Sequence, residues 1–111
     1  MFDLDKDTGT ITFIKKDTAS FTVSLDNHEL TDGDVVLFTV APNLEMEEPS
    51  LQKRIEEFNE DGSATINILA NDTRDMEIGT YLYDVQVNLA DGRVDTFIGP
   101  NKFKLLGGVT Y

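Results

Sequence analysis

The chain contains the stretch Gly79-Thr80-Tyr81-Leu82-Tyr83-Asp84-Val85-Gln86-Val87-Asn88-Leu89, and this stretch decides the fold class. From Tyr81 to Leu89 every second residue is large and apolar, and the residues between are mostly polar. A period of two is that of a β-strand with one buried face, because successive side chains of a strand point to opposite sides of the sheet. The stretch predicts a half-buried strand, with Tyr81 and Tyr83 in the core and their hydroxyls at its rim.

The flanking sequence carries further strand signals. Runs rich in β-branched and aromatic residues, which are typical of strands, occupy 10–14, 21–25, 35–40, 63–69, 94–98 and 103–105. Turn signals separate several of them, and Asp91-Gly92 predicts a hairpin with a two-residue turn. The run 35–40 is nearly all apolar and predicts a central strand covered on both faces. About seven or eight strands, with turns at intervals of roughly ten residues, predict an all-β sandwich of antiparallel strands.

Residues 43–61 are ambiguous, because Leu51, Ile55 and Phe58 fall at helical spacing among residues that favour helices. The segment nevertheless lies between two predicted strands of an alternating chain. We expect a loop followed by a strand near 52–58, and a helix is the alternative.

Asn71-Asp72-Thr73 can cap one short helical turn near 71–77 that Gly79 ends. Met76 or Ile78 would lie beneath this turn as an apolar plug. The same three residues match the pattern of an N-glycosylation acceptor, but capping explains them without a sugar.

Length and composition limit the possible functions. The chain has 111 residues, which fits one domain, 1–111, with one hydrophobic core. Twenty-one acidic and nine basic residues give a formal net charge of −12, which disfavours nucleic acid and anionic membranes as partners. The chain has no cysteine, so disulfides and thiolate chemistry are excluded. The N-terminus lacks the basic and apolar regions of a signal peptide, so we expect a protein made in the cytoplasm.

Few residues form a pattern that points to chemistry. The series Asp3-x-Asp5-x-Asp7 resembles the first half of a calcium loop. However, Gly9 falls one position late and Ile14 stands where a bidentate acid belongs, so we interpret the series as a solvated N-terminal segment. His28 is the single histidine, and no serine has the flanking glycines of a nucleophile elbow. We therefore predict no catalytic, cofactor-binding or metal-binding residue.

Five groups of residues, in order along the chain, resemble the motifs of a known family. They are Asp17-Thr18-Ala19-Ser20-Phe21; Gly33-Asp34-Val35-Val36-Leu37-Phe38-Thr39-Val40; Gln52-Lys53-Arg54-Ile55; Asp72-Thr73 with Gly79, Tyr81 and Tyr83-Asp84-Val85-Gln86; and Thr96-Phe97-Ile98-Gly99-Pro100 with Phe103-Lys104-Leu105 and Val109-Thr110. The family consists of immunoglobulin-like domains in phages and prophages of Gram-positive bacteria, and it includes the N-terminal domain of upper baseplate proteins. The chain departs from the family pattern where Lys16 replaces the usual glycine and Met76 replaces the usual leucine.

The resemblance implies an immunoglobulin-like β-sandwich with a strand at 52–55. It also implies a non-enzymatic virion component, a structural module of the tail, baseplate or head-tail region that is made in the bacterial cytoplasm. The implied partners are other phage structural proteins, with assembly in several copies and without a cofactor. Such a module presents a sheet face or a loop end to a neighbouring subunit. The polar side of the central strand supplies the candidate interaction face, Asp84, Gln86 and Asn88.

A second hypothesis is a host-recognition or adhesin module that holds a glycan or calcium in its loops. The candidate loop contacts are His28, Asn43 and Asp91. Exposed aromatic residues usually line such sites, and these loops contain none. A small hydrolase that uses a carboxylate pair is a third hypothesis, but twenty-one acids make such pairs unavoidable by chance.

Overall fold

The computed structural model describes residues 2–5, 7–25, 29–42 and 49–107. Its elements in chain order are β1 (Phe2–Leu4), β2 (Ile11–Ile14), β3 (Ala19–Val23), β4 (Val35–Ala41), β5 (Leu51–Ile55), β6 (Ala64–Ile68), α1 (Ala70–Thr73), β7 (Gly79–Asn88) and β8 (Val94–Leu106). The predicted all-β class and the single short helix are confirmed.

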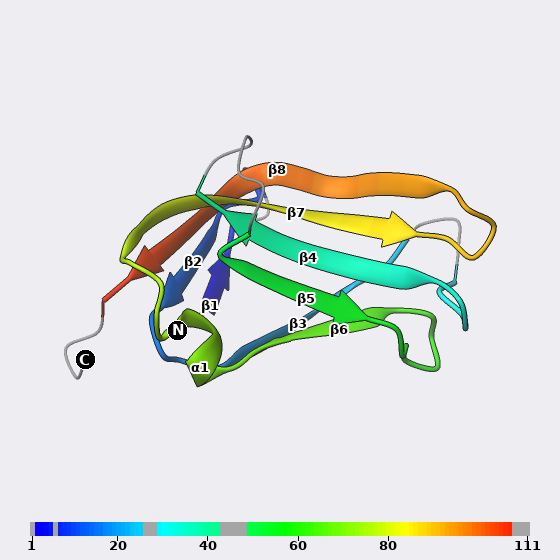
Figure 1. Ribbon diagram of the computed structural model, residues 1–111, viewed down its shortest axis with the longest axis horizontal. Helices are drawn as coiled ribbons and strands as arrows, with labels where there is room; N and C mark the ends of the chain where they lie inside the picture. Colours follow the sequence, from blue (N-terminus) through cyan, green and yellow to red (C-terminus); the bar gives the residue numbers. More distant parts are fainter. Residues whose placement is uncertain (1, 6, 26–28, 43–48, 108–111) are drawn as a thin grey trace.

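Two sheets pack face to face as a β-sandwich (Figure 1). The large sheet has the strand order β1-β2-β8-β7-β4-β5, and the small sheet consists of β3 and β6. The small sheet lies over one face of the large sheet, and the described elements leave the opposite face uncovered (Figure 1). The core fills the space between the two sheets.

One strand pair departs from the expected antiparallel arrangement. β2 and β8 run parallel, whereas the other neighbours in both sheets are antiparallel. The prediction of antiparallel strands throughout is therefore wrong at this pair. The parallel pair arises because β1 and β2 join the large sheet beside β8, and β8 runs in the same direction as β2.

β1 is a strand that the sequence analysis does not predict. It forms a hairpin with β2, and the connecting turn is closed by Asp5. The backbone N–H of Gly9 donates to the carbonyl of Asp5 at 2.7 Å, and the N–H of Asp7 donates to Asp5 Oδ1 at 2.9 Å. The described side chains of this region are exposed, as a solvated segment requires, but the strand itself is not predicted, because three residues are too few to produce a recognisable period.

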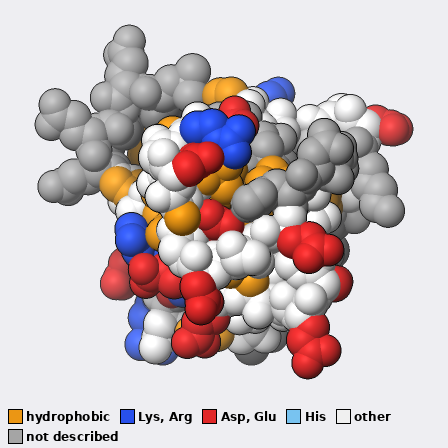
Figure 2. All heavy atoms as spheres, turned by 90° about the vertical axis from the view of Figure 1, so that its right-hand side faces the viewer, with side chains coloured by type: hydrophobic (Ala, Val, Ile, Leu, Met, Phe, Trp, Pro, Cys, Tyr) orange, Lys and Arg blue, Asp and Glu red, His pale blue; other side chains and the backbone are white. Residues whose placement is uncertain are grey.

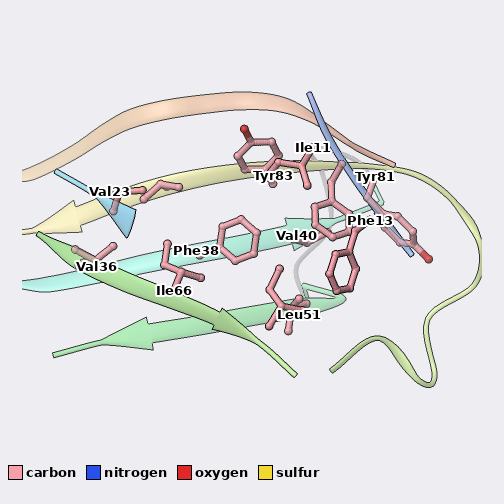
Figure 3. Packing of buried hydrophobic residues seen from close by; sticks show 14 of the residues in the cluster. Ile11, Phe13, Val23, Val36, Phe38, Val40, Leu51, Ile66, Tyr81 and Tyr83 are labelled. Carbon is pink, nitrogen blue, oxygen red and sulfur yellow. The ribbon is translucent and has the colours of Figure 1, made fainter. Parts of the chain in front are cut away.

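β7 supplies a complete row of the core, as its period of two predicts. Its inward side chains are all buried: Tyr81, Tyr83, Val85 and Val87. Opposite them, the ring of Phe38 lies with its centroid 5.7 Å from that of Tyr83 (Figure 3). Pairs of aromatic rings at such separations stabilise a core beyond the area that they bury.

Both tyrosine hydroxyls of β7 reach the rim of the core and bond to backbone. Tyr81 Oη donates to the carbonyl of Glu77 at 2.5 Å, and Tyr83 Oη donates to the carbonyl of Gly9. Burial raises the pKa of both phenols. The prediction of core tyrosines with hydroxyls at the rim is confirmed.

β4 is half-buried, and the prediction that both its faces are covered is wrong. Its inward side chains are fully buried, whereas Val35, Leu37 and Thr39 are half-buried on the uncovered face of the large sheet. The long apolar run reflects its position between β5 and β7, whose side chains shield its outward residues laterally.

Residues 51–55 form strand β5, so a strand is confirmed here and the helix alternative is wrong, but the strand ends at Ile55 and does not reach Phe58 as predicted. β5 pairs with β4 along its whole length, and this pairing outweighs the helix propensity of its residues. The predicted helical turn is also present, but α1 ends at Thr73. Met76 is buried and is the apolar plug, while Ile78 is 59% exposed.

β8 is one long strand where the sequence suggests two separate ones. It continues from Val94 to Leu106, with a register shift against β7 opposite Tyr83 and Val85. Gly99 lies at this irregularity with φ of 97°, and a Cβ there would come within 2.6 Å of the Tyr83 carbonyl oxygen. Gly99-Pro100 therefore forms a bulge and does not end the strand.

Candidate functional site

The candidate site is the uncovered face of the large sheet, which we call the open face. Strand pairing brings nine outward residues of β4, β5 and β7 together there: Val35, Leu37, Thr39, Gln52, Arg54, Leu82, Asp84, Gln86 and Asn88. The three residues predicted from the sequence therefore lie on one face, as the period of two requires.

The register of the strands gives each predicted residue a specific neighbour. Asp84 pairs with Thr39 of β4, Gln86 with Leu37, and Asn88 with Val35. Side chains at such directly opposite positions lie within contact distance of one another. The open face thus combines polar and apolar side chains, which are half-buried on β4 and β7 and exposed on β5.

Asp84 is the acidic residue among these nine and lies on β7, between β4 and β8. Partial burial raises the pKa of its carboxyl group. Its neighbour Thr39 is engaged with β5, since Gln52 Nε2 donates to Thr39 Oγ1 at 3.1 Å. Within the described part of the chain, Asp84 makes no hydrogen bond and no ion pair, so its carboxylate is available to a donor from outside.

Asn88 is a second acceptor without a partner. Its Oδ1 is buried and receives no hydrogen bond from the described residues. A buried polar atom that lacks a partner costs about 1–3 kcal/mol. Because this atom is enclosed, a partner's donor reaches it only if the Asn88 side chain turns outward, so the acceptor that the open face presents directly is the carboxylate of Asp84.

Of the three predicted loop contacts, the structure describes Asp91 alone. His28 and Asn43 lie outside the described residues. Asp91 lies in the turn between β7 and β8, where Oδ1 accepts from the backbone N–H of Arg93 at 3.0 Å and Oδ2 accepts from Arg93 Nε at 2.8 Å. The backbone bond from Arg93 is the largest cause that lowers the pKa of Asp91. This carboxylate therefore holds its own turn together.

The turn between β7 and β8, which contains Asp91, lies at the right-hand end of the molecule in Figure 1, and this end faces the viewer in Figure 2. Acidic side chains are spread over that end, with a few basic ones among them (Figure 2). Pro42 follows β4 at the opposite end, because Ala41 pairs with Leu82 while Val35 pairs with Asn88. The described residues that flank β4, Asp34 and Pro42, consequently lie toward different ends of the molecule.

The described residues contain no group of three or more His, Asp or Glu side chains that could hold a metal ion. In the partial calcium pattern, Asp5 Oδ1 accepts from the backbone N–H groups of Asp7 and Thr8, at 2.9 and 3.4 Å. The aspartate series therefore shapes the turn between β1 and β2.

A groove beside β3 is a feature that the sequence analysis missed. It has a volume of about 360 Å³ and is lined by residues of both sheets, including Ile11, Phe21 and Tyr83. A sequence signal exists, because β3 contains no charged residue and alternates Phe21 and Val23 with polar residues. That signal does not indicate where in the fold the groove lies.

In the part of the chain that the structure describes, no helix has the length and apolar character needed to cross a membrane. Comparison with protein-family models and with curated protein sequences gives no match.

Proposed function

We propose that this protein is a non-enzymatic structural module of a phage or prophage virion, located in the tail, baseplate or head-tail region. It acts through protein-protein contacts with other structural proteins of the particle and is present there in several copies. The family resemblance of its sequence motifs suggests the type of particle. The observation that carries the contact function is the open face, where the half-buried carboxylate of Asp84 has no donor among the described residues.

The composition of the open face supports a protein partner. Interfaces between proteins combine apolar contact with hydrogen bonds at intervals of roughly 100–200 Å². The open face offers both, since Leu37 and Val35 are half-buried apolar residues beside the polar row of β7. A partner that contributes Lys, Arg or amide N–H groups opposite Asp84 would pair a carboxylate that burial already desolvates.

The proposal is tested with particles from an induced lysogen that expresses tagged variants. The wild-type chain is expected to co-sediment with particles, and Asp84→Arg is expected to reduce the amount at least about tenfold, because like charges at an interface cost several kcal/mol. Glu60→Arg is the matched control, since it makes the same charge change at an exposed position away from the open face. Thermal melting of each variant checks that it folds.

Absence of the wild-type chain from purified particles would contradict the virion proposal. Equal incorporation of Asp84→Arg and Glu60→Arg would contradict the assignment of the open face. The alternative of a glycan- or calcium-binding adhesin module is tested by a glycan array and by melting with added calcium, since bound ligand raises stability. No specific observation favours it, because the carboxylate of Asp91 is used by its own turn.

A further inference from the structure

One edge of the small sheet has no strand beside it within the described residues. β3 pairs with β6 along one edge, and no described strand pairs with β3 along the other. In an immunoglobulin sandwich the first strand usually pairs with the second in the same sheet. Here β1 and β2 both join the large sheet, so the usual neighbour of β3 lies elsewhere.

The free edge of β3 also lacks the features that normally prevent strand addition. Proteins protect edge strands by charged residues, by proline or by keeping them very short. β5, at an edge of the large sheet, carries Lys53 and Arg54, and β1 has only three residues. β3 spans five residues, Ala-Ser-Phe-Thr-Val, with neither charge nor proline. Among the residues that the structure describes, nothing therefore blocks pairing along this edge.

The groove runs beside this edge and offers contacts for the side chains of an added strand. Tyr83 and Val85 of β7 form part of its lining, with Ile11 of β2 and Val23 of β3 on either side (Figure 3). The hydroxyl of Tyr83 donates to the carbonyl of Gly9 and so fixes the turn between β1 and β2 at one end of the groove. An added strand could thus bury apolar side chains while its backbone pairs with β3.

Charge determines which kind of strand fits. Asp5 is the charged residue in the lining, and its Oδ2 makes no hydrogen bond with the described residues. The chain as a whole carries a net charge of −12, so a second copy would be repelled. A basic segment from a different protein would be attracted to the groove by the same charges.

We infer that the free edge of β3 binds an extended segment of another protein as an added strand, with alternating apolar residues in the groove and a Lys or Arg opposite Asp5. This is recognition by β-augmentation, in which backbone hydrogen bonds give affinity and side-chain pockets give specificity. The inference rests on the proposed function as a protein-docking module and assigns it a second surface, distinct from the open face.

The test uses a synthetic heptapeptide of alternating lysine and valine, blocked at both ends, with the full chain. We expect saturable binding by nuclear magnetic resonance titration and slower amide hydrogen exchange within residues 19–23. A peptide with proline in place of the central valine keeps the charge but cannot pair along its length, and a glutamate-valine peptide reverses the charge. Both are expected to bind at least about tenfold more weakly.

Two variants locate the binding site. Thr22 and Thr80 are both exposed on strands, so Thr22→Lys and Thr80→Lys make the same substitution at β3 and at β7. Thr22→Lys is expected to weaken binding of the lysine-valine peptide about tenfold, and Thr80→Lys to change it less than about twofold.

The inference would be overturned if the proline peptide bound as tightly as the lysine-valine peptide. It would also be overturned if bound peptide slowed amide exchange in β5 or β8 in place of β3. A dimer of the chain that Thr22→Lys abolishes would overturn the choice of a basic partner and assign the edge to a second copy. Co-sedimentation with particles distinguishes failure of this inference from failure of the proposed function. If the wild-type chain and Thr22→Lys both co-sediment fully with particles, the inference fails and the proposed function stands; if neither does, the proposed function fails.

Discussion

Lys16 holds a backbone conformation that glycine adopts more readily than lysine. Its φ is 72°, in the left-handed region that costs a residue with a side chain about 1–2 kcal/mol. Its backbone N–H donates to Thr73 Oγ1 at 2.9 Å, which joins the turn after β2 to the buried end of α1. Glycine is usual at this position in the family that the sequence resembles, and the positive φ explains this preference.

Lys16→Gly is therefore expected to be neutral or to stabilise the fold by up to about 1 kcal/mol, since relief of strain exceeds the added entropy of the unfolded chain. The bond to Thr73 uses the backbone and is retained. Chemical denaturation measures the effect, with Lys15→Gly as the control, which is expected to destabilise by about 0.5–1 kcal/mol. A loss of more than about 1 kcal/mol in Lys16→Gly would contradict the account.

Asp84 links stability to pH through its partial burial. Because burial raises the pKa of this carboxyl above the usual 3.8, the folded state binds its proton more tightly than the unfolded state does. The free energy of unfolding consequently falls as pH rises from about the usual value through the raised one. At neutral pH the charged Asp84 opposes folding.

Asp84→Asn is expected to melt at a higher temperature than the wild type at pH 7, and the difference is expected to shrink as the pH falls below about 4. Removing one negative charge from an acidic protein stabilises it in any case, so exposed Glu60→Gln is the control. Scanning calorimetry across this pH range checks the result. A gain in Asp84→Asn no larger than in Glu60→Gln at pH 7 would show that burial is not the cause.

At the scale of elements, the bulge in β8 allows one strand to run along the whole length of β7. Gly99 and Gly92 both have positive φ, at 97° and 96°. They differ in their surroundings, because a Cβ at Gly99 would come within 2.6 Å of the Tyr83 carbonyl oxygen, whereas a Cβ at Gly92 would meet nothing within 4 Å. Substitution of these two glycines therefore distinguishes the energetic cost of backbone strain from that of a close contact.

Alanine substitutions at these glycines give an element-level prediction. Gly92→Ala is expected to cost about 1–2 kcal/mol from backbone strain. Gly99→Ala is expected to cost about 1–3 kcal/mol more, because the carbonyl of β7 must move as well. Equilibrium unfolding in urea measures both. Equal losses would mean that the contact between Gly99 and β7 is unimportant.

The strands that the sequence predicts correctly are those with a clear period or a long β-branched run. β7 and the sandwich follow from the alternation that begins at Tyr81, and β5 follows from its place between strands. The joining of β8 across Gly99-Pro100 could not be predicted, because a Gly-Pro pair usually ends a strand and only pairing with β7 turns it into a bulge. The parallel pairing of β2 with β8 depends on contacts far apart in sequence.

At the scale of the whole molecule, the net charge of −12 opposes the compact state through self-repulsion. Among the described residues, the ion pairs of Arg54 with Glu56 and of Arg93 with Asp91 join exposed side chains close in sequence. Such pairs contribute little to stability. The pair of Lys53 Nζ with Asp72 Oδ2, at 2.7 Å, is less exposed and joins β5 to α1. The chain still carries a net charge of −12, so salt or a basic partner would relieve the remaining repulsion.

Sodium chloride is expected to raise the melting temperature steadily up to about 0.3 M, where the screening length is already below about 10 Å. Sucrose at equal osmolality, which screens no charge, is the control. A melting temperature that falls or stays constant with salt would contradict the role of self-repulsion.

The outward positions of Asp84, Gln86 and Asn88 could be predicted from the sequence, because the period of two fixes which side of a strand each residue occupies. The lack of donors for Asp84 and Asn88, and the groove beside β3, could not be predicted. Both depend on which strands become neighbours, and the register between β4 and β7 sets the partners of every side chain on the open face.

Footprinting of carboxyl groups on assembled particles tests docking through the open face most directly. The free chain and the particles are labelled under equal conditions, and modification of Asp84 is compared with that of exposed Glu60 by mass spectrometry. The account predicts that Asp84 is modified in the free chain and at least about tenfold less in particles, while Glu60 reacts equally in both. Equal modification of Asp84 in the free chain and in particles would contradict the claim that the open face is the docking surface.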